Sequence, residues 1–174
     1  MDFLDIESVL ENIELKESML AAEFGCGSAH FTISLAKKLK KGRIYAFDIQ
    51  PEKLSALEGK IKHEHLSNVK IILSDLEKPN GSTLKDNSID IVVIPNLLFQ
   101  AQDKYSIIKE AYRILKTGGQ ILIIDWQKNS ILNLKNEIFD ANQAKQMAQE
   151  IGFEPKKEFM ASDHHYGLLF VKNK

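Results

Sequence analysis

The sequence contains little cysteine and no excess of charge of either sign. Cys26 is the single cysteine among 174 residues, which excludes a disulfide scaffold and an all-thiolate zinc site. The 23 basic and 24 acidic side chains give a net charge of -1 at pH 7. No global electrostatic field therefore attracts the chain to nucleic acid or to anionic lipid.

Long apolar runs are also absent. No run approaches the roughly 18 residues that a membrane-spanning helix needs, and the acidic N-terminus lacks the basic segment of a secretory signal. Hydrophobic residues make up 44% and charged residues 27%, as in ordinary soluble domains, which argues against a disordered or fibrous protein. These features predict a cytoplasmic enzyme or binding domain that has no contact with a membrane.

Apolar periodicity predicts strands that alternate with helices. After a short N-terminal helix within residues 1–18, we expect strands at 19–24, 43–48, 69–74, 89–94 and 120–126. Helices are expected at about 30–39, from Pro51 onward, at 104–115 before Gly118 and Gly119, and at 140–151. A terminal strand pair is expected at 156–161 and 166–172.

This order specifies an α/β fold. Parallel strands need right-handed crossovers, so helices cover both faces of the sheet, and ligands bind outside the carboxyl ends of the strands where the strand order reverses. The length is that of about one domain, and no repeat or linker divides the chain. We predict a single domain over 1–174, with a core at 19–126 and a C-terminal helix and strand pair at 127–174.

A glycine-containing loop follows the first predicted strand. Gly25 and Gly27 permit a tight turn and close approach of a ligand to the backbone, at the start of a helix whose amides favour polar groups. The dinucleotide fingerprint GxGxxG needs glycine at position 30, where His30 stands, and this disfavours NAD. The alternative is a glycine turn used only for packing.

Carboxylates end the next two strands. Asp48 lies about 20 residues beyond the loop, where it can accept two hydrogen bonds from ribose hydroxyls. The alternative role is a helix cap before Pro51. Asp75 is placed to read the edge of an adenine, and its alternative is an ordinary turn aspartate. Together the loop and the carboxylates describe a nucleoside pocket.

Five segments in order resemble the motifs of one family. They are AAEFGCGSAHFTISLAKKL, RIYAFDIQPEKLSAL, NVKIILSDLEKP, NSIDIVVIPNLLF and EAYRILKTGGQILIIDW. They are similar to class I S-adenosylmethionine-dependent methyltransferases, in particular to the group near the ubiquinone/menaquinone and arsenite methyltransferases. The resemblance covers roughly residues 5 to 172. It implies a three-layer, doubly wound, Rossmann-like sheet of seven strands, mostly parallel with an antiparallel last strand, and a cofactor-binding core at 19–126.

The resemblance also implies the residues that hold S-adenosylmethionine and its product S-adenosylhomocysteine. Glu23 matches the acid near the methionine amino end, and Asp48 matches the ribose acid. The full set of implied cofactor residues is Glu23, Gly25, Cys26, Gly27, Asp48, Ile49, Asp75, Leu76, Pro95 and Asn96. Ala29 departs from the family, because most members have glycine there, and its methyl group either tightens packing or narrows the pocket.

An acceptor site is expected at the start of the last strand. In the family arrangement this strand runs antiparallel beside the fifth, which places its beginning at the cofactor edge. His165 and Tyr166 are then the candidate catalytic residues, because imidazole can take a proton near neutral pH, and the candidate substrate residues are Trp126, His164 and Asn96. The alternative is a turn with a packed aromatic side chain. No metal site is expected, because His63 and His65 do not share a helical face.

The favoured function is methyl transfer to a small molecule by in-line displacement. Residues 95–99 lack the Asn/Asp-Pro-Pro-aromatic run of many amino-group methyltransferases, and a single cysteine disfavours arsenite as substrate. About 18 residues precede the first strand, which predicts an open pocket, or one that a homodimer or partner subunit completes. Two alternatives stay open: a non-catalytic or partner-dependent cofactor-binding module, and an RNA or protein methyltransferase, of which the near-neutral charge disfavours RNA.

Overall fold

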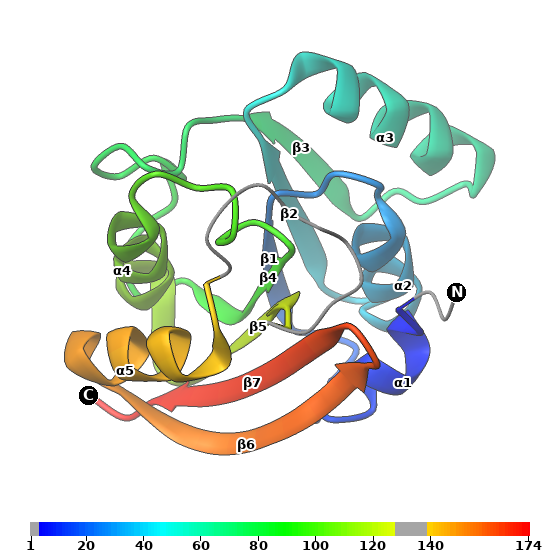
Figure 1. Ribbon diagram of the computed structural model, residues 1–174. Coiled ribbons are helices and arrows are strands. Elements are labelled where there is room, and N and C mark those ends of the chain that lie inside the picture. Colours follow the sequence, from blue (N-terminus) through cyan, green and yellow to red (C-terminus); the bar gives the residue numbers. More distant parts are fainter. Residues whose placement is uncertain (1–3, 128–138) are drawn as a thin grey trace.

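The computed structural model describes residues 4–127 and 139–174, which form one seven-stranded sheet in the order β3-β2-β1-β4-β5-β7-β6 (Figure 1). The strands are β1 (Leu20–Phe24), β2 (Arg43–Asp48), β3 (Val69–Leu73), β4 (Ile89–Pro95), β5 (Leu115–Trp126), β6 (Phe153–Ser162) and β7 (His165–Lys172). The helices are α1 (Ile6–Leu10), α2 (His30–Lys38), α3 (Pro51–His63), α4 (Lys104–Ile114) and α5 (Ala141–Ile151). No helix of the described residues is long and apolar enough to cross a bilayer.

Strand directions confirm the expected fold class. Strands β3, β2, β1, β4 and β5 pair in parallel, whereas β7 runs antiparallel to both of its neighbours, β5 and β6. Trp126 at the end of β5 therefore lies opposite His165 at the start of β7. The order reverses beside β1, which pairs with β2 on one side and with β4 on the other.

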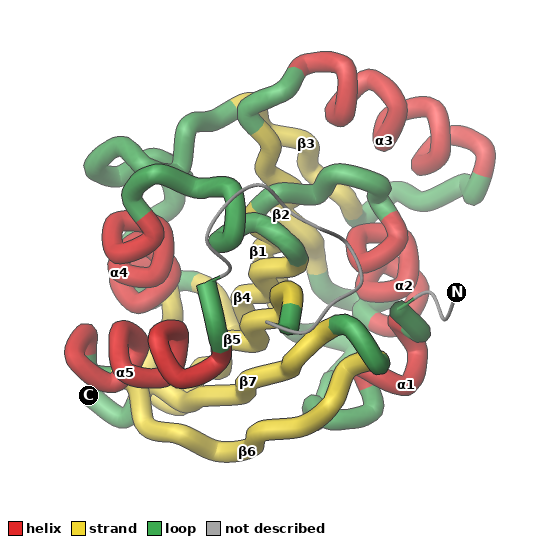
Figure 2. Tube along the Cα trace, in the orientation of Figure 1, coloured by secondary structure: helices red, strands yellow, loops and turns green. Residues whose placement is uncertain are grey.

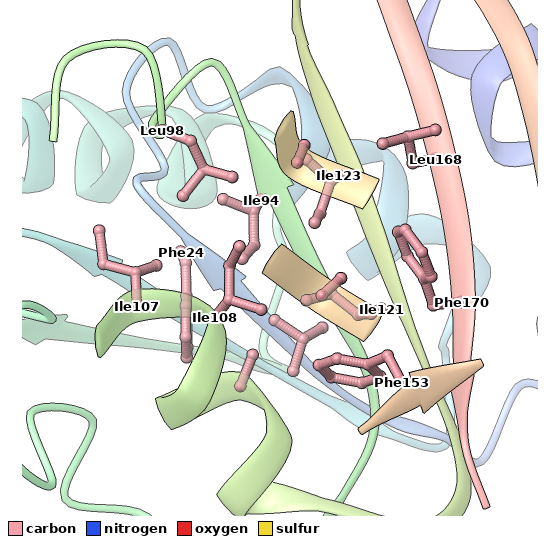
Figure 3. Close-up of a cluster of buried hydrophobic side chains, with 14 of the residues drawn as sticks. Phe24, Ile94, Leu98, Ile107, Ile108, Ile121, Ile123, Phe153, Leu168 and Phe170 are labelled. Atoms are coloured by element: carbon pink, nitrogen blue, oxygen red, sulfur yellow. The ribbon is translucent and has the colours of Figure 1, made fainter. Parts of the chain in front are cut away.

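Two layers of helices cover the sheet (Figure 2). Side chains of α4 and α5 pack on one face in a core that includes Phe24, Ile94 and Phe170, drawn in Figure 3. Helices α1 and α2 pack on the opposite face against Ala21 and Val93, and α3 extends that layer. Successive strand residues point to opposite faces, so the nearly continuous apolar strands are buried on both sides.

Local signals set several helix starts as the sequence predicts. Pro51 is the first residue of α3, where its missing N–H costs no helical hydrogen bond. Asp140 caps α5 in a reciprocal capping box with Gln143, in which each side chain accepts the other residue's backbone N–H at 3.0 Å. Helix α1 is shorter than the apolar spacing over residues 3–15 indicates, yet Val9 and Ile13 are still buried.

The end of α4 differs from the expectation. The helix ends at Ile114, four residues before Gly118, and β5 begins at Leu115 instead of residue 120. Leu115 is fully buried and pairs with Ile89, and the register then shifts so that Ile91 pairs with Gln120. Sheet pairing of a buried leucine thus ends the helix, and the glycines serve a bulge within the strand, with φ +79° at Gly118.

Lys172 anchors the end of β7. It is 5% exposed, and its ammonium group donates hydrogen bonds of 2.8 Å to Asn87 Oδ1 and to the backbone oxygens of Tyr112 and Leu115. The ammonium also lies 4.6 Å from the ring centroid of Tyr112. Lys172 thus ties the last strand to α4, to β5 and to the turn before β4.

We expect Lys172→Met to lower the free energy of unfolding by about 2–4 kcal/mol, because the apolar side chain leaves two buried carbonyl groups without their charged donor. Urea unfolding at neutral pH measures the change. Lys41→Met is the control, since Lys41 forms only an exposed ion pair with Glu17, and a change within about 0.5 kcal/mol is expected there. Equal losses in the two variants would contradict the anchoring role.

Candidate functional site

A cavity of about 790 Å³ opens at the carboxyl ends of β1, β2 and β4, where the strand order reverses. This volume lies within the range of roughly 300–1,000 Å³ that is typical of small-molecule sites. All ten predicted cofactor residues line it: Glu23, Gly25, Cys26, Gly27, Asp48, Ile49, Asp75, Leu76, Pro95 and Asn96. The fold therefore gathers the whole set around one space, and their contact with a ligand stays a prediction.

The glycine loop is held against the end of β2. The backbone N–H groups of Gly25 and Cys26 donate to the carbonyl oxygen of Phe47 at 2.9 and 2.8 Å. Gly25 has φ +79°, and a Cβ atom there would lie 3.2 Å from Leu97 Cδ1. Glycine at 25 is thus favoured mainly by the backbone conformation, and the close approach of Leu97 after β4 adds to the preference.

Cys26 has no nucleophilic character in this loop. Its side chain is buried, and burial raises the pKa of the thiol to about 12. A thiol with that pKa stays protonated at neutral pH, and only the thiolate is a strong nucleophile. Cys26 therefore acts as a small loop residue on the cavity wall.

Ala29 adopts a left-handed conformation at the residue before α2, with φ +71° and ψ 0°. This left-handed conformation favours glycine over alanine at this position. The methyl group is buried in a cluster with Leu54 and Leu57 of α3 and is not among the atoms that line the described cavity. The departure from glycine therefore tightens the packing of α3 and does not narrow the cavity.

Asp48 connects the glycine loop to α3. One carboxylate oxygen accepts the N–H of Gly27 at 3.0 Å and the other accepts the N–H of Gln50 at 3.0 Å. Gln50 is the N-cap residue of α3, so Asp48 does not cap that helix in the usual way. Each oxygen can accept a further hydrogen bond, which leaves capacity for a ligand.

The wall beside Asp48 continues with Ile49 and Asp75. Ile49 is 60% exposed although it is apolar, and it lines the cavity. The carboxylate of Asp75 accepts the N–H of Glu77 at 3.1 Å and lies 3.4 Å from the ammonium of Lys78. Asp75 is thus a turn aspartate that also lines the cavity, and its contact with an adenine stays a prediction.

Glu23 is a buried acid at the floor of the cavity. It is 1% exposed, and its carboxylate accepts a short hydrogen bond from the Thr32 hydroxyl of α2. Burial raises the pKa of Glu23 to about 8, and the nearby charge of Asp48 adds to the rise. At neutral pH Glu23 is therefore largely protonated until a cation approaches it.

The segment after β4 forms the opposite wall. Asn96 has φ +50°, and its backbone N–H donates to the carbonyl oxygen of Ile124 at 2.8 Å. Asp125, fully buried at the end of β5, accepts the N–H of Phe99 at 3.0 Å and the N–H of Trp126 at 2.8 Å. Burial raises the pKa of Asp125 to about 6. These bonds hold the wall against β5.

Four of the five predicted acceptor residues lie at the same end of the sheet but outside the residues that line the described cavity: Trp126, His164, His165 and Tyr166. The Trp126 and His165 rings lie 4.1 Å apart, centroid to centroid. Tyr166 is 4% exposed, and its hydroxyl donates to the carbonyl oxygen of Phe139 at 2.9 Å. Burial raises the pKa of that hydroxyl. Asn96 is the one predicted substrate residue on the cavity wall.

Some cavity residues were not singled out from the sequence. Leu4 and Ile6 of the N-terminal segment and His30 of α2 line the cavity. Ile6 belongs to the apolar stripe of the predicted N-terminal helix, but that stripe does not indicate which apolar residue faces a ligand. The predicted open pocket therefore has a wall from the N-terminus, although no long lid precedes β1 in the described residues.

Comparisons with known proteins agree with this geometry. The sequence model of a family described as "Methyltransferase domain" matches residues 15–165. The chain is similar to the demethylmenaquinone methyltransferase of Geobacillus sp. (strain WCH70), with 27% identity over 134 residues that cover 74% of this chain and 54% of that protein. The chain thus spans about half the length of the curated relatives it matches.

Solved structures share the fold. One is a SAM-dependent methyltransferase from Aquifex aeolicus, with a TM-score of 0.87 and 23% identity over 97% of this chain and 90% of that one. Another is the complex of the Haloferax volcanii Trm112 methyltransferase activator with a methyltransferase, with a TM-score of 0.82 and 14% identity over 97% of this chain and 88% of that one. Some proteins of this fold therefore bind an activator partner.

The raised pKa of Glu23 predicts a pH-dependent stability. The folded protein keeps a proton that the unfolded chain releases above its ordinary pKa of 4.5, so the free energy of unfolding falls as the pH rises from about 5 to 8. Glu23→Gln cannot ionise. We expect its stability to fall less over this range, with a difference on the order of 2–4 kcal/mol at pH 8.

Urea unfolding at several pH values tests this expectation. The matched control is Glu58→Gln, because Glu58 forms only an exposed ion pair with Lys62 on α3. Curves for wild type and Glu23→Gln that stay parallel over the whole range would show that Glu23 does not hold a proton in the folded protein.

Ala29 gives a second stability test. Ala29→Gly relieves strain of about 1–2 kcal/mol but loses a buried methyl group worth about 0.8 kcal/mol and gains flexibility in the unfolded chain worth about 0.5–1 kcal/mol. We expect a net change within about 1 kcal/mol. Ala29→Val should lose about 2 kcal/mol or more, because a β-branched residue is strained at positive φ. Thermal melting of both variants checks the ranking, and a Val variant as stable as the Gly variant would contradict it.

Proposed function

This chain belongs to the methyltransferase domain family, of class I, whose members use S-adenosylmethionine. We propose that it binds this cofactor in the cavity and transfers the methyl group to a small molecule. The observation that carries the proposal is the hydrogen bond from the Gly27 N–H to the Asp48 carboxylate. It joins the glycine loop to the acid that the family resemblance assigns to the ribose, at the point where the strand order reverses.

The residues present fit a sulfonium nucleoside. Asp48 offers charged acceptors for two ribose hydroxyls, and Ile49 offers an exposed apolar surface for a base. Glu23 offers a buried carboxyl group for an amino cation, whose arrival would favour release of the carboxyl proton. Gly25 supplies the left-handed backbone conformation of the loop, and a Cβ atom there would lie in tight contact with Leu97. No part of this set requires a phosphate.

Catalysis in this proposal depends on positioning. The bound cofactor supplies a methyl group on a sulfonium leaving group, suited to in-line displacement. The wall after β4, fixed by Asp125, orients the acceptor beside the cavity, which converts a bimolecular encounter into an aligned one. The predicted catalytic residues His165 and Tyr166 begin β7, but burial lowers the pKa of His165 to about 4 and the Tyr166 hydroxyl is bonded to Phe139, so this proposal favours an acceptor that needs no strong base.

A small molecule is proposed as the methyl acceptor because the charge of the chain disfavours RNA. The net charge of -1 disfavours RNA as a substrate. Among the residues that line the described cavity, Lys53 and His30 are the only basic ones. The curated relatives named for demethylmenaquinone are consistent with a small acceptor, although this chain spans about half their length.

A partner-dependent module is the second candidate. The Haloferax volcanii relative was solved in complex with an activator, and the N-terminal wall of the cavity here comes only from Leu4 and Ile6 among the described N-terminal residues. A homodimer or a partner subunit would complete such a wall. Mass-spectrometric detection of methylated products, from the small-molecule fraction of cell extract and from whole extract, each incubated with the protein and labelled cofactor, separates the two: products in whole extract alone indicate a partner-dependent module.

Calorimetry tests the cofactor. We expect S-adenosylmethionine and S-adenosylhomocysteine to bind in the micromolar range, which corresponds to roughly 8 kcal/mol, and NAD not to bind. Asp48→Ala should weaken binding by about 1–3 kcal/mol, because the ribose donors lose their charged acceptor. Asp163→Ala, a change in the exposed turn before β7, is the control and should leave affinity unchanged. Binding of NAD with no response to either sulfur nucleoside would overturn the proposal.

A further inference from the structure

Four buried side-chain polar atoms in the described parts of the chain have no hydrogen-bond partner. They are Asn96 Oδ1, Trp126 Nε1, His164 Nδ1 and His165 Nε2. They come from separate stretches of sequence, yet all lie where β4 and β5 end and β7 begins. Buried polar groups are nearly always hydrogen-bonded in folded proteins, so a cluster of exceptions needs an explanation.

Two of these atoms belong to one aromatic cluster. Trp126 and His165 are register partners on β5 and β7, and their rings lie 4.1 Å apart at an interplanar angle of 37°. Phe99, from the segment after β4, lies edge-on to Trp126 at 6.4 Å and 82°. His165 is 6% exposed, so its free nitrogen is withheld from bulk water.

The contact with Ser162 is the basis on which we assign the tautomer of His165. Ser162 Oγ accepts the backbone N–H of His164 at 3.1 Å and lies 2.9 Å from His165 Nδ1. Among the described residues, His165 Nδ1 is the acceptor within reach of the Ser162 hydroxyl hydrogen. We therefore assign the Ser162 hydroxyl as donor and His165 Nδ1 as acceptor. Nε2 then carries the ring hydrogen. Burial lowers the pKa of His165 to about 4, which keeps the ring neutral at pH 7.

Trp126 Nε1 and His165 Nε2 are therefore both N–H donors without an acceptor. The indole can only donate, and leaving two such donors unpaired in one apolar cluster costs free energy that a bound acceptor atom would recover. Asn96 lies next to this cluster and also lines the cavity. It directly follows Pro95, whose register partner Ile124 is two residues before Trp126 on β5.

We propose that Trp126 and His165 form a two-donor subsite that binds a carbonyl or carboxylate oxygen of a planar methyl acceptor. The inference rests on the proposed function and specifies its substrate class. An oxygen with two lone pairs can accept both N–H groups, and the flat rings of Trp126 and Phe99 favour a planar ligand over a branched one. Methyl-accepting substrates that carry only hydrogen-bond donors, such as alkylammonium compounds, would leave these two N–H groups unpaired and are disfavoured.

The single tryptophan makes the subsite observable, because Trp126 gives the one indole N–H signal in a proton–nitrogen correlation spectrum. The full chain is titrated with benzoate, with toluene as a planar probe without oxygen, and with cyclohexanecarboxylate as a carboxylate without a planar ring. Each titration is run with and without S-adenosylhomocysteine. We expect benzoate to shift the indole signal saturably and more tightly than cyclohexanecarboxylate, and toluene to leave the N–H shift nearly unchanged.

Variants separate binding from folding. His165→Phe keeps an aromatic ring but no donor, and should weaken benzoate binding about five- to tenfold. His165→Gln keeps an N–H group near the position of Nε2 and should retain affinity within about threefold. His63→Phe is the control, because its side chain is 86% exposed at the end of α3. Each variant is first checked by its melting temperature.

Two results would overturn the subsite: an indole signal that no oxygen-bearing probe shifts, or benzoate affinity that is the same in wild type and folded His165→Phe. Binding of S-adenosylhomocysteine, measured by calorimetry on the same samples, tests the proposed function separately. If that ligand fails to bind while benzoate still shifts the indole signal in the absence of nucleoside, the subsite stands and the methyltransferase proposal falls.

Discussion

The pairing of β1 with β2 on one side and with β4 on the other is the constraint on which the site depends. It brings the ends of three strands to one edge, so that the glycine loop, Asp48 and the segment after β4 meet around the same cavity. This pairing produces the hydrogen bond from the Gly27 N–H to Asp48. It also produces the close approach of Leu97 to Gly25. The first depends on the pairing of β1 with β2 and the second on the pairing of β1 with β4.

Buried acidity is the main electrostatic feature of the cavity. Glu23 and Asp48 are both nearly inaccessible, and within the described residues neither forms an ion pair. Burial, and to a smaller extent the charge of Asp48, raises the pKa of Glu23 and favours its protonation, and the Asp48 carboxylate accepts two backbone N–H groups. The cavity thus places two buried carboxyl groups next to each other, at Glu23 and Asp48.

The opposite side of the site is organised by β7. Its antiparallel insertion places His165 against Trp126, and Lys172 at its far end secures the strand to the core. Tyr166, next along the strand, points to the other face and is held by Phe139. Strand alternation thus gives these neighbouring residues different surroundings, with a free ring nitrogen on His165 and a satisfied hydroxyl on Tyr166.

The sequence by itself determined the α/β class and the number of strands, because apolar periodicity is a local signal. Glycine spacing and strand-end acids pointed to one edge of the sheet by one geometric rule, and the resemblance to the methyltransferase family added the antiparallel last strand and the ten predicted cofactor residues that line the cavity. Only the tertiary structure decided that Ala29 packs under α3, that Leu115 begins β5, that Leu4 and Ile6 reach the cavity, and which ring atoms beside Trp126 lack partners. These outcomes depend on contacts between segments distant in sequence, and such contacts override local propensity because burial of side chains outweighs it.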